Sequence, residues 1–203
     1  VYISDGDNIQ YCQHAMAKIF EQSGRGKIPM NWTISPALVD FAPMMLNYYY
    51  RKATTNDCFV SGPSGLGYAM PYDAHNYRYY ASQNNSALIT PYTQLTQRYI
   101  EKAGLRVITI WDDVSSVQRR VYAENCPYLY GLTINDWERQ IGRLTTKVQS
   151  NWLPITVQYP CYANSVDVIT DFFNRDIKNF TGSKPMFVTG QATVWDVGPD
   201  KLV

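Results

Sequence analysis

The segment IPMNWTI at residues 28–34, followed by Ser35-Pro36, decides the fold class of this chain. A run of apolar, aromatic and β-branched residues favours a strand. Ser at the N-cap and Pro at the first helical position are the ordinary start of a helix. The segment therefore predicts a strand that passes directly into a helix ending near residue 51.

The same order of strand and helix recurs along the chain. Strands are predicted at residues 1–5, 28–34, 58–61, 106–111, 128–134, 152–159 and 185–195. Helices are predicted at residues 9–22, 36–51, 90–104, 115–123 and 165–179, with a long loop at residues 62–85. About seven strands with helices between most of them require a largely parallel sheet.

A parallel sheet of this kind is either a closed barrel or an open doubly wound sheet. No Gly-rich phosphate loop follows the first strand, and each helix is long enough to pack outside a closed sheet. We therefore predict an α/β fold, a TIM-like (β/α) barrel of about seven parallel strands. Residues 1–203 are expected to form one domain, excised from a longer multi-domain protein.

Alternation within the strands predicts which side chains face inward. The set expected to meet the helices is apolar: Val1, Ile3, Met30, Ile34, Ile155, Val157, Met186 and Val188. The set expected inside is small and polar: Ser4, Thr33, Ser35, Thr133, Asn135, Thr156, Gln158, Thr189 and Gln191. This lining predicts a bowl for a hydrophilic ligand, or else hydroxyl groups that only bond one another in a narrow interior.

Composition excludes some partners. Lys and Arg number 18 and Asp and Glu 17, for a net charge of +1, which argues against a nucleic-acid partner. No apolar stretch is long enough to span a bilayer. The 17 Tyr residues suit either sugar-stacking surfaces or ordinary packing between helices and sheet.

Cysteines and glycosylation sequons bear on the compartment. The four Cys residues permit two disulfides without requiring them. N-x-S/T sequons begin at Asn31, Asn84 and Asn179. We therefore expect an extracytoplasmic setting (secreted, periplasmic or cell surface).

Acidic residues follow several strands, at the edge where parallel α/β folds carry their sites. Asp5 and Asp7 follow the first strand, Asp112 the fourth and Asp136 the fifth, whereas Asp57 precedes a strand and is expected to be structural. Glycoside cleavage needs two carboxyl groups, one protonated and one ionised. The alternative is that Asp-Gly-Asp-Asn is only a turn and helix cap.

Other chemistries find less support. The only His residues, His14 and His75, lack the spacing of a zinc pair, so no metal or other cofactor is expected. A calcium or magnesium ion held by Asp5 and Asp7 has no further support in the sequence. No nucleophile elbow of the GxSxG type is present.

Three motifs resemble one known family. GLGYAMP at residues 65–71 resembles the GxGYxYP motif, with Met70 in place of the usual Tyr. YISDGDN at residues 2–8 and PMNWT at residues 29–33 are similar to two further segments of that family. The resemblance implies the C-terminal domain of the GxGYxYP glycoside hydrolases, a TIM-like barrel usually preceded by another domain.

The expected function is glycoside hydrolysis on an oligo- or polysaccharide. Asp7 and Asp112 are the leading catalytic carboxylates, with Asp5 and Asp136 in reserve. Five residues are expected to orient the sugar: Asn8, Trp32, Tyr68, Tyr72 and Trp111. The alternatives are a barrel that binds carbohydrate without cleaving it, and one that contacts an N-terminal domain of the same protein.

Overall fold

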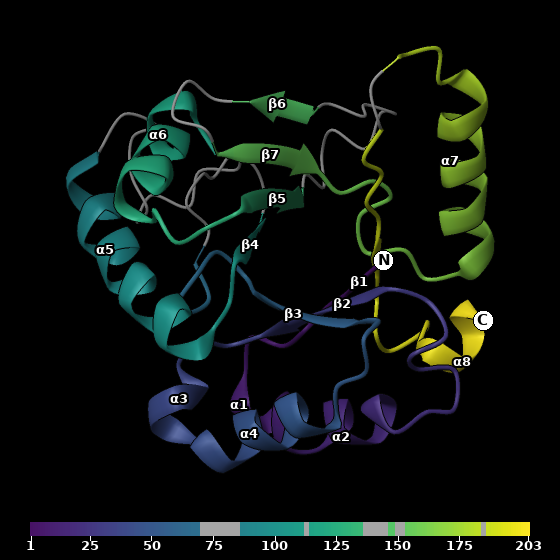
Figure 1. Ribbon diagram of the computed structural model, residues 1–203, viewed down its shortest axis with the longest axis horizontal. Helices are drawn as coiled ribbons and strands as arrows, with labels where there is room; N and C mark the ends of the chain where they lie inside the picture. Colours follow the sequence, from purple (N-terminus) through teal and green to yellow (C-terminus); the bar gives the residue numbers. More distant parts are fainter. Residues whose placement is uncertain (70–85, 112–113, 136–145, 149–152, 184–185) are drawn as a thin grey trace.

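A computed structural model describes residues 1–69, 86–111, 114–135, 146–148, 153–183 and 186–203 (Figure 1). The strands are β1 (Tyr2–Ile3), β2 (Met30–Ile34), β3 (Asp57–Ser61), β4 (Val107–Trp111), β5 (Gly131–Asn135), β6 (Thr146–Val148), β7 (Pro154–Val157) and β8 (Gln191–Ala192). The helices are α1 (Ile9–Gln13), α2 (Ala15–Phe20), α3 (Leu38–Phe41), α4 (Pro43–Lys52), α5 (Ser86–Ala103), α6 (Ser116–Asn125), α7 (Val166–Asn179) and α8 (Pro199–Leu202).

Each predicted strand and helix has an observed counterpart, with differences at the ends. The expected helix over residues 9–22 is divided at His14 into α1 and α2. Helix α5 begins at Ser86, so Pro91 lies inside the helix rather than at its first position. Helix α6 begins as expected, because the Ser115 and Gln118 side chains form a reciprocal capping box. Strand β6 and helix α8 were not predicted.

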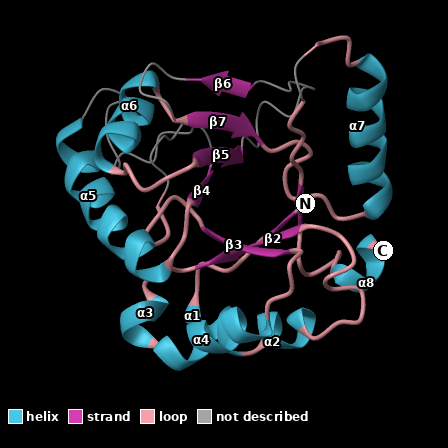
Figure 2. Cartoon of the chain, viewed as in Figure 1, coloured by secondary structure: helices cyan, strands magenta, loops and turns pink. Residues whose placement is uncertain are grey.

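The strands form one sheet in the order β6-β7-β5-β4-β3-β2-β1-β8. Seven of them are parallel, as predicted, and β6 runs antiparallel to β7. The sheet curls into a half-barrel with helices around it (Figure 2). The closed TIM-like barrel is therefore wrong for the described residues. Strand β6 occupies the edge of β7 that β8 would have to reach.

The two sides of the half-barrel still meet near the carboxyl ends of the strands. Tyr159 N donates to Thr189 O at 2.7 Å, and Ala163 N donates to Gln191 O at 2.7 Å. A single parallel bridge joins Ala163 to Ala192. These contacts join the segment after β7 to β8 without a continuous ladder, and they place residues 159–163 on the side of β8 opposite to β1.

Strand alternation is confirmed. Ile3, Met30 and Ile34 lie in the apolar core under the helices. On the inner face, Thr109 and Thr133 share a hydrogen bond at 3.0 Å. Gln158 Nε2 donates to Thr133 Oγ1 at 2.7 Å. The concave face of the sheet is thus polar and its convex face apolar.

The four cysteines, all in the described part of the chain, form no disulfide with one another; Cys12, Cys126 and Cys161 are buried and Cys58 is exposed. No helix in the described part of the chain is both long enough and apolar enough to cross a membrane.

Candidate active site

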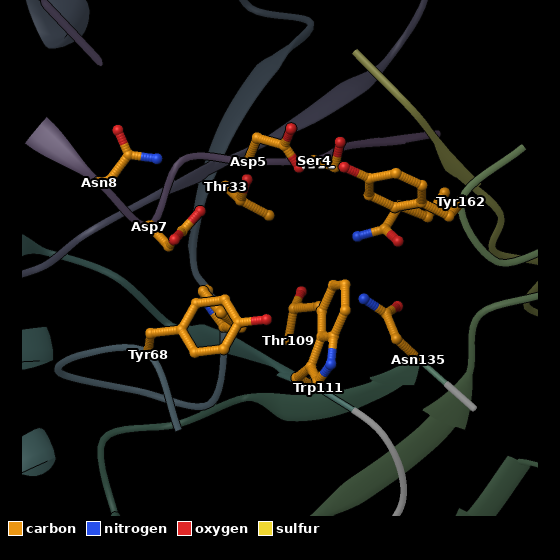
Figure 3. Close-up of a pocket in the computed structure, with 13 residues that line it drawn as sticks. Ser4, Asp5, Asp7, Asn8, Thr33, Tyr68, Thr109, Trp111, Asn135 and Tyr162 are labelled. Carbon is orange, nitrogen blue, oxygen red and sulfur yellow. Dashed lines mark hydrogen bonds between the residues drawn. The ribbon is translucent and has the colours of Figure 1, made fainter. Parts of the chain in front are cut away.

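The Asp5-Gly6-Asp7 turn sits directly on the neighbouring strand. Thr33 Oγ1 accepts a hydrogen bond from Gly6 N at 2.9 Å and donates one to Ile3 O at 2.9 Å. A Cβ atom on Gly6 would lie 1.5 Å from Thr33 O, so only glycine allows this close approach. Asp5 has a left-handed backbone, with φ of 71°. The turn places the Asp5 and Asp7 side chains at the mouth of β1 (Figure 3).

Helix α1 is capped by Asn8. Its Oδ1 accepts a hydrogen bond from Tyr11 N at 2.6 Å, the ordinary N-cap contact. The N-cap position is therefore taken by Asn8 rather than by Asp7.

A polar cavity of about 260 Å³ opens at this edge of the sheet (Figure 3). Its inner wall consists of side chains that strand alternation placed inside: Ser4, Thr33, Asn135 and Gln191, joined by Thr109. The remaining lining residues are Asp5, Asp7, Asn8, Gly62, Pro63, Tyr68, Trp111 and Tyr162. We call this space the polar cavity.

Three aromatic side chains border the polar cavity. The Trp111 ring lies 5.9 Å from that of Tyr68 and 6.2 Å from that of Tyr162, measured between ring centroids. The backbone N of Trp111 donates a hydrogen bond to Ser64 Oγ at 3.0 Å. An aromatic border around a polar floor suits a sugar, whose ring carries both C–H faces and hydroxyl groups.

The loop with the GxGY residues is held against α5. Leu66 N donates to Thr96 Oγ1 at 3.2 Å, and the Tyr92 hydroxyl donates to Gly67 O at 2.7 Å. Gly65 has φ of +133°, and a Cβ atom there would lie 2.6 Å from Thr96 Oγ1. Gly65 thus lets the loop turn close to α5 and carry Tyr68 to the polar cavity.

Asp5 is held by Tyr162. The Tyr162 hydroxyl donates to Asp5 Oδ1 at 2.6 Å. Burial raises the pKa of Tyr162 to about 12, and its hydrogen bond to Asp5 and the negative charge of Asp5 act in the same direction. Tyr162 therefore stays protonated at neutral pH and orients the Asp5 carboxyl group.

Asp7 is in a different environment. Burial raises the pKa of Asp7, and the negative charge of Asp5 adds to this, against the lowering effect of hydrogen bonds from its own backbone and Asn8. Asp7 also borders a second cavity of about 400 Å³, which we call the apolar cavity. Its other lining residues are Ile9, Ser35, Ala37, Leu38, Phe41, Leu66, Gly67 and Tyr99. Asp7 thus stands between a polar and an apolar space.

Most of the described residues predicted for the site come together. Asp5, Asp7, Asn8, Tyr68 and Trp111 all line the polar cavity. Three further predicted residues, Asp112, Asp136 and Tyr72, lie outside the described residues.

Trp32 does not reach the polar cavity. Its ring is fully buried on the helix side of the sheet, 4.9 Å from the Phe20 ring between centroids. Its Nε1 donates to Asp57 Oδ1 at 2.8 Å. The expectation that Trp32 orients a sugar is therefore wrong. Trp32 has the same strand parity as Met30 and Ile34, and alternation turns all three toward the helices.

Tyr162 was not predicted as a site residue. It follows β7 with a left-handed backbone, φ 52°, and reaches Asp5 because residues 159–163 pair with β8. Its position past the carboxyl end of a strand was the one available signal. Asn135 and Gln191 were predicted from alternation to line a bowl for a hydrophilic ligand, but they were not named among the site residues.

No group of three or more His, Cys, Asp and Glu residues able to hold a metal ion occurs in the part of the chain that the structure describes.

Similarity to known proteins agrees with the motifs. The model of a family described as "GxGYxYP putative glycoside hydrolase C-terminal domain" matches residues 1–203. The fold is similar to a crystal structure described as a putative hydrolase from Bacteroides thetaiotaomicron VPI-5482, with a TM-score of 0.75 and 22% sequence identity. The alignment covers 99% of this chain and 39% of that chain. No curated protein sequence matches. Because the family model matches residues 1–203, the chain belongs to the GxGYxYP family and corresponds to the C-terminal domain of that family.

Proposed function

We propose that this chain hydrolyses glycosides, with Asp7 as the general acid. The observation that carries the proposal is the contrast between the two carboxyl groups of the polar cavity. Asp5 accepts a 2.6 Å hydrogen bond from Tyr162, while burial and the charge of Asp5 raise the pKa of Asp7. Glycosidases need one carboxyl group that holds a proton and one that is ionised.

The two cavities suggest how a substrate lies. A sugar ring in the polar cavity would place its glycosidic oxygen near Asp7, and the leaving group would enter the apolar cavity. Asp7 would then give its proton to the departing oxygen. Asp5 is the candidate for the ionised carboxyl group among the described residues. Asp112 and Asp136, predicted from their positions after strands, remain candidates for the same role.

The test compares Asp7→Asn with the parent chain on two substrates that share a sugar. A 4-nitrophenyl glycoside needs little help from an acid, because nitrophenolate leaves without a proton, whereas an alkyl glycoside depends on one. We expect Asp7→Asn to lower kcat on the alkyl glycoside by about a hundredfold or more, or ~2.7 kcal/mol in the barrier. The loss on the nitrophenyl glycoside should be much smaller.

Asp171→Asn is the matched control, because Asp171 is an exposed carboxylate on α7. It should leave both rates unchanged. Equal rates for parent and Asp7→Asn on the alkyl glycoside would refute the role of Asp7. Binding of sugars by the parent without turnover of either substrate would favour a domain that binds carbohydrate without cleaving it.

A further inference from the structure

Asn135 is the last residue of β5, and its side-chain amide lines the polar cavity. The residue is 1% exposed. Its Oδ1 and Nδ2 atoms both lack a hydrogen-bond partner among the described residues. Nearly all buried polar groups in proteins are paired, since an unpaired one costs about 1–3 kcal/mol. This amide is therefore kept at a cost to the fold.

The neighbouring buried amide, that of Gln158, is partly paired. Gln158 lies beside Asn135 on the inner face, because Gln158 N donates to Ile134 O at 2.9 Å. Gln158 Nε2 is satisfied by Thr133 Oγ1 at 2.7 Å, although Gln158 Oε1 is also unpaired. Of these two amides, Asn135 lines the polar cavity and Gln158 does not, and Figure 3 shows the Asn135 amide beside the Trp111 ring.

Charge limits the kind of ligand. The described residues that line the polar cavity include Asp5 and Asp7 but no Lys, Arg or His. A carboxylate or sulfate on a ligand would meet negative charge with no cation to balance it. A hydroxyl group both donates and accepts, so a neutral amide with one free donor and one free acceptor suits hydroxyl groups.

The volume of the polar cavity also limits the kind of ligand. The cavity volume of about 260 Å³ lies below the ~300–1,000 Å³ of pockets for drug-sized ligands. This space suits one sugar ring rather than several.

We propose that Asn135 binds two hydroxyl groups of a single neutral sugar, the terminal unit of the glycan. This inference rests on the proposed function and names its substrate class: neutral sugars recognised one ring at a time. Asn135 is then a specificity-determining residue, because its amide is hydrogen-bonded only when the sugar is bound.

The experiment measures binding by calorimetry, independently of turnover. The probes are methyl glycosides of glucose, galactose and mannose, with methyl glucuronide as the anionic counterpart of the glucoside. We expect at least one neutral probe to bind the parent chain, and the glucuronide to bind at least tenfold more weakly than the glucoside if the glucoside is the one bound. Asn135→Leu should weaken binding of the neutral probe at least tenfold.

Melting temperature separates a ligand-binding amide from a structural one. Leu is close to Asn in size and has no polar atoms to leave unpaired, so Asn135→Leu should keep or raise the Tm. The control is Gln118→Leu, because Gln118 is also a buried amide but accepts from Ser115 N at 2.8 Å in the α6 capping box. That variant should lower the Tm and leave sugar affinity unchanged.

Deoxygenated sugars identify the hydroxyl groups. For the best neutral probe, removal of the hydroxyl group at two ring positions should weaken binding to the parent and have little effect on Asn135→Leu. If neutral probes bind the parent and Asn135→Leu equally well, or if Asn135→Leu lowers the Tm as Gln118→Leu does, the role of Asn135 is refuted while the proposed function stands. If no probe binds the parent, the inference of a site for one neutral sugar ring is refuted, and the turnover experiment with Asp7→Asn decides the proposed function separately.

Discussion

Two aspartates of this chain, Asp57 and Asp7, differ in what surrounds their carboxyl groups. Asp57, at the start of β3, accepts from Trp32 Nε1 at 2.8 Å, from Thr54 N at 2.8 Å and from Arg25 at 2.5 Å. Asp7, past the end of β1, borders two cavities. The first carboxyl group is fully engaged by the protein, and the second is accessible to a ligand.

The pKa values of Asp57 and Asp7 shift in opposite directions. Burial by itself would raise the pKa of Asp57, but hydrogen bonds from Thr54, Trp32 and Arg25 outweigh it and leave the pKa lowered. Burial raises the pKa of Asp7, and the nearby charge of Asp5 adds to the effect. The comparison teaches that the number of donors around a buried carboxyl group separates a structural role from a chemical one in this fold.

Trp32→Ala should have the largest effect on stability. The Trp32 ring is fully buried against Phe20, and truncation of a buried Trp costs about 3–5 kcal/mol. Trp111→Ala is the contrast, because Trp111 is partly exposed at the polar cavity. Urea denaturation should report less than half the loss for Trp111→Ala, and sugar affinity should fall only there. A larger stability loss for Trp111→Ala would reverse the assignment of the two rings.

Asp57→Ala should have the next-largest effect on the free energy of unfolding. It leaves Trp32 Nε1 without its acceptor and Arg25 without its ion pair, and breaking such a buried pair costs about 3 kcal/mol. Because the pKa of Asp57 is lowered in the fold, its contribution is present above the unfolded value of about 3.9 and is lost as pH falls below it. Urea unfolding at pH 7 and pH 3 should therefore show a smaller difference between parent and variant at pH 3. An equal difference at both pH values would contradict the account.

The smallest effect concerns Asn8. Asn8→Ala removes the cap of α1 and should cost about 1 kcal/mol, whereas Asn8→Asp keeps an acceptor for Tyr11 N and should cost little. The free energy of unfolding of both variants, from urea titration, checks this. If Asn8→Asp is as unstable as Asn8→Ala, the capping role is wrong.

Local rules predicted much of this molecule. The seven parallel strands and the polar inner face follow from strand alternation, and the start of α6 follows from Ser115. The predicted helix start at Ser35-Pro36 is wrong, because α3 begins at Leu38 and Ser35 does not cap it. The edges of the sheet did not follow, because β6 pairs with β7 through residues far from any clear strand pattern. The pairing joins neighbouring segments, Thr146 with Thr156, and it occupies the edge of β7 that a closed barrel would need for β8.

The candidate site also contains residues that were predicted from the sequence and residues that were not. Asp5, Asp7, Tyr68 and Trp111 were found because residues after parallel strands share one edge. Trp32 was misplaced because it was expected at the site from its place near the end of a strand, whereas its parity with Met30 and Ile34 turns it toward the helices. The Tyr162–Asp5 hydrogen bond spans most of the chain, so no local pattern could predict it.

The most direct test of the central contrast is an NMR titration of the side-chain carboxyl carbons of Asp7 and Asp57. The account predicts a midpoint for Asp7 above the ordinary value of about 3.9 and a midpoint for Asp57 below it. Asp5→Asn should lower the Asp7 midpoint, because it removes a negative charge, and should leave Asp57 unchanged. An Asp7 midpoint at or below the ordinary value would contradict the assignment of Asp7 as the proton donor.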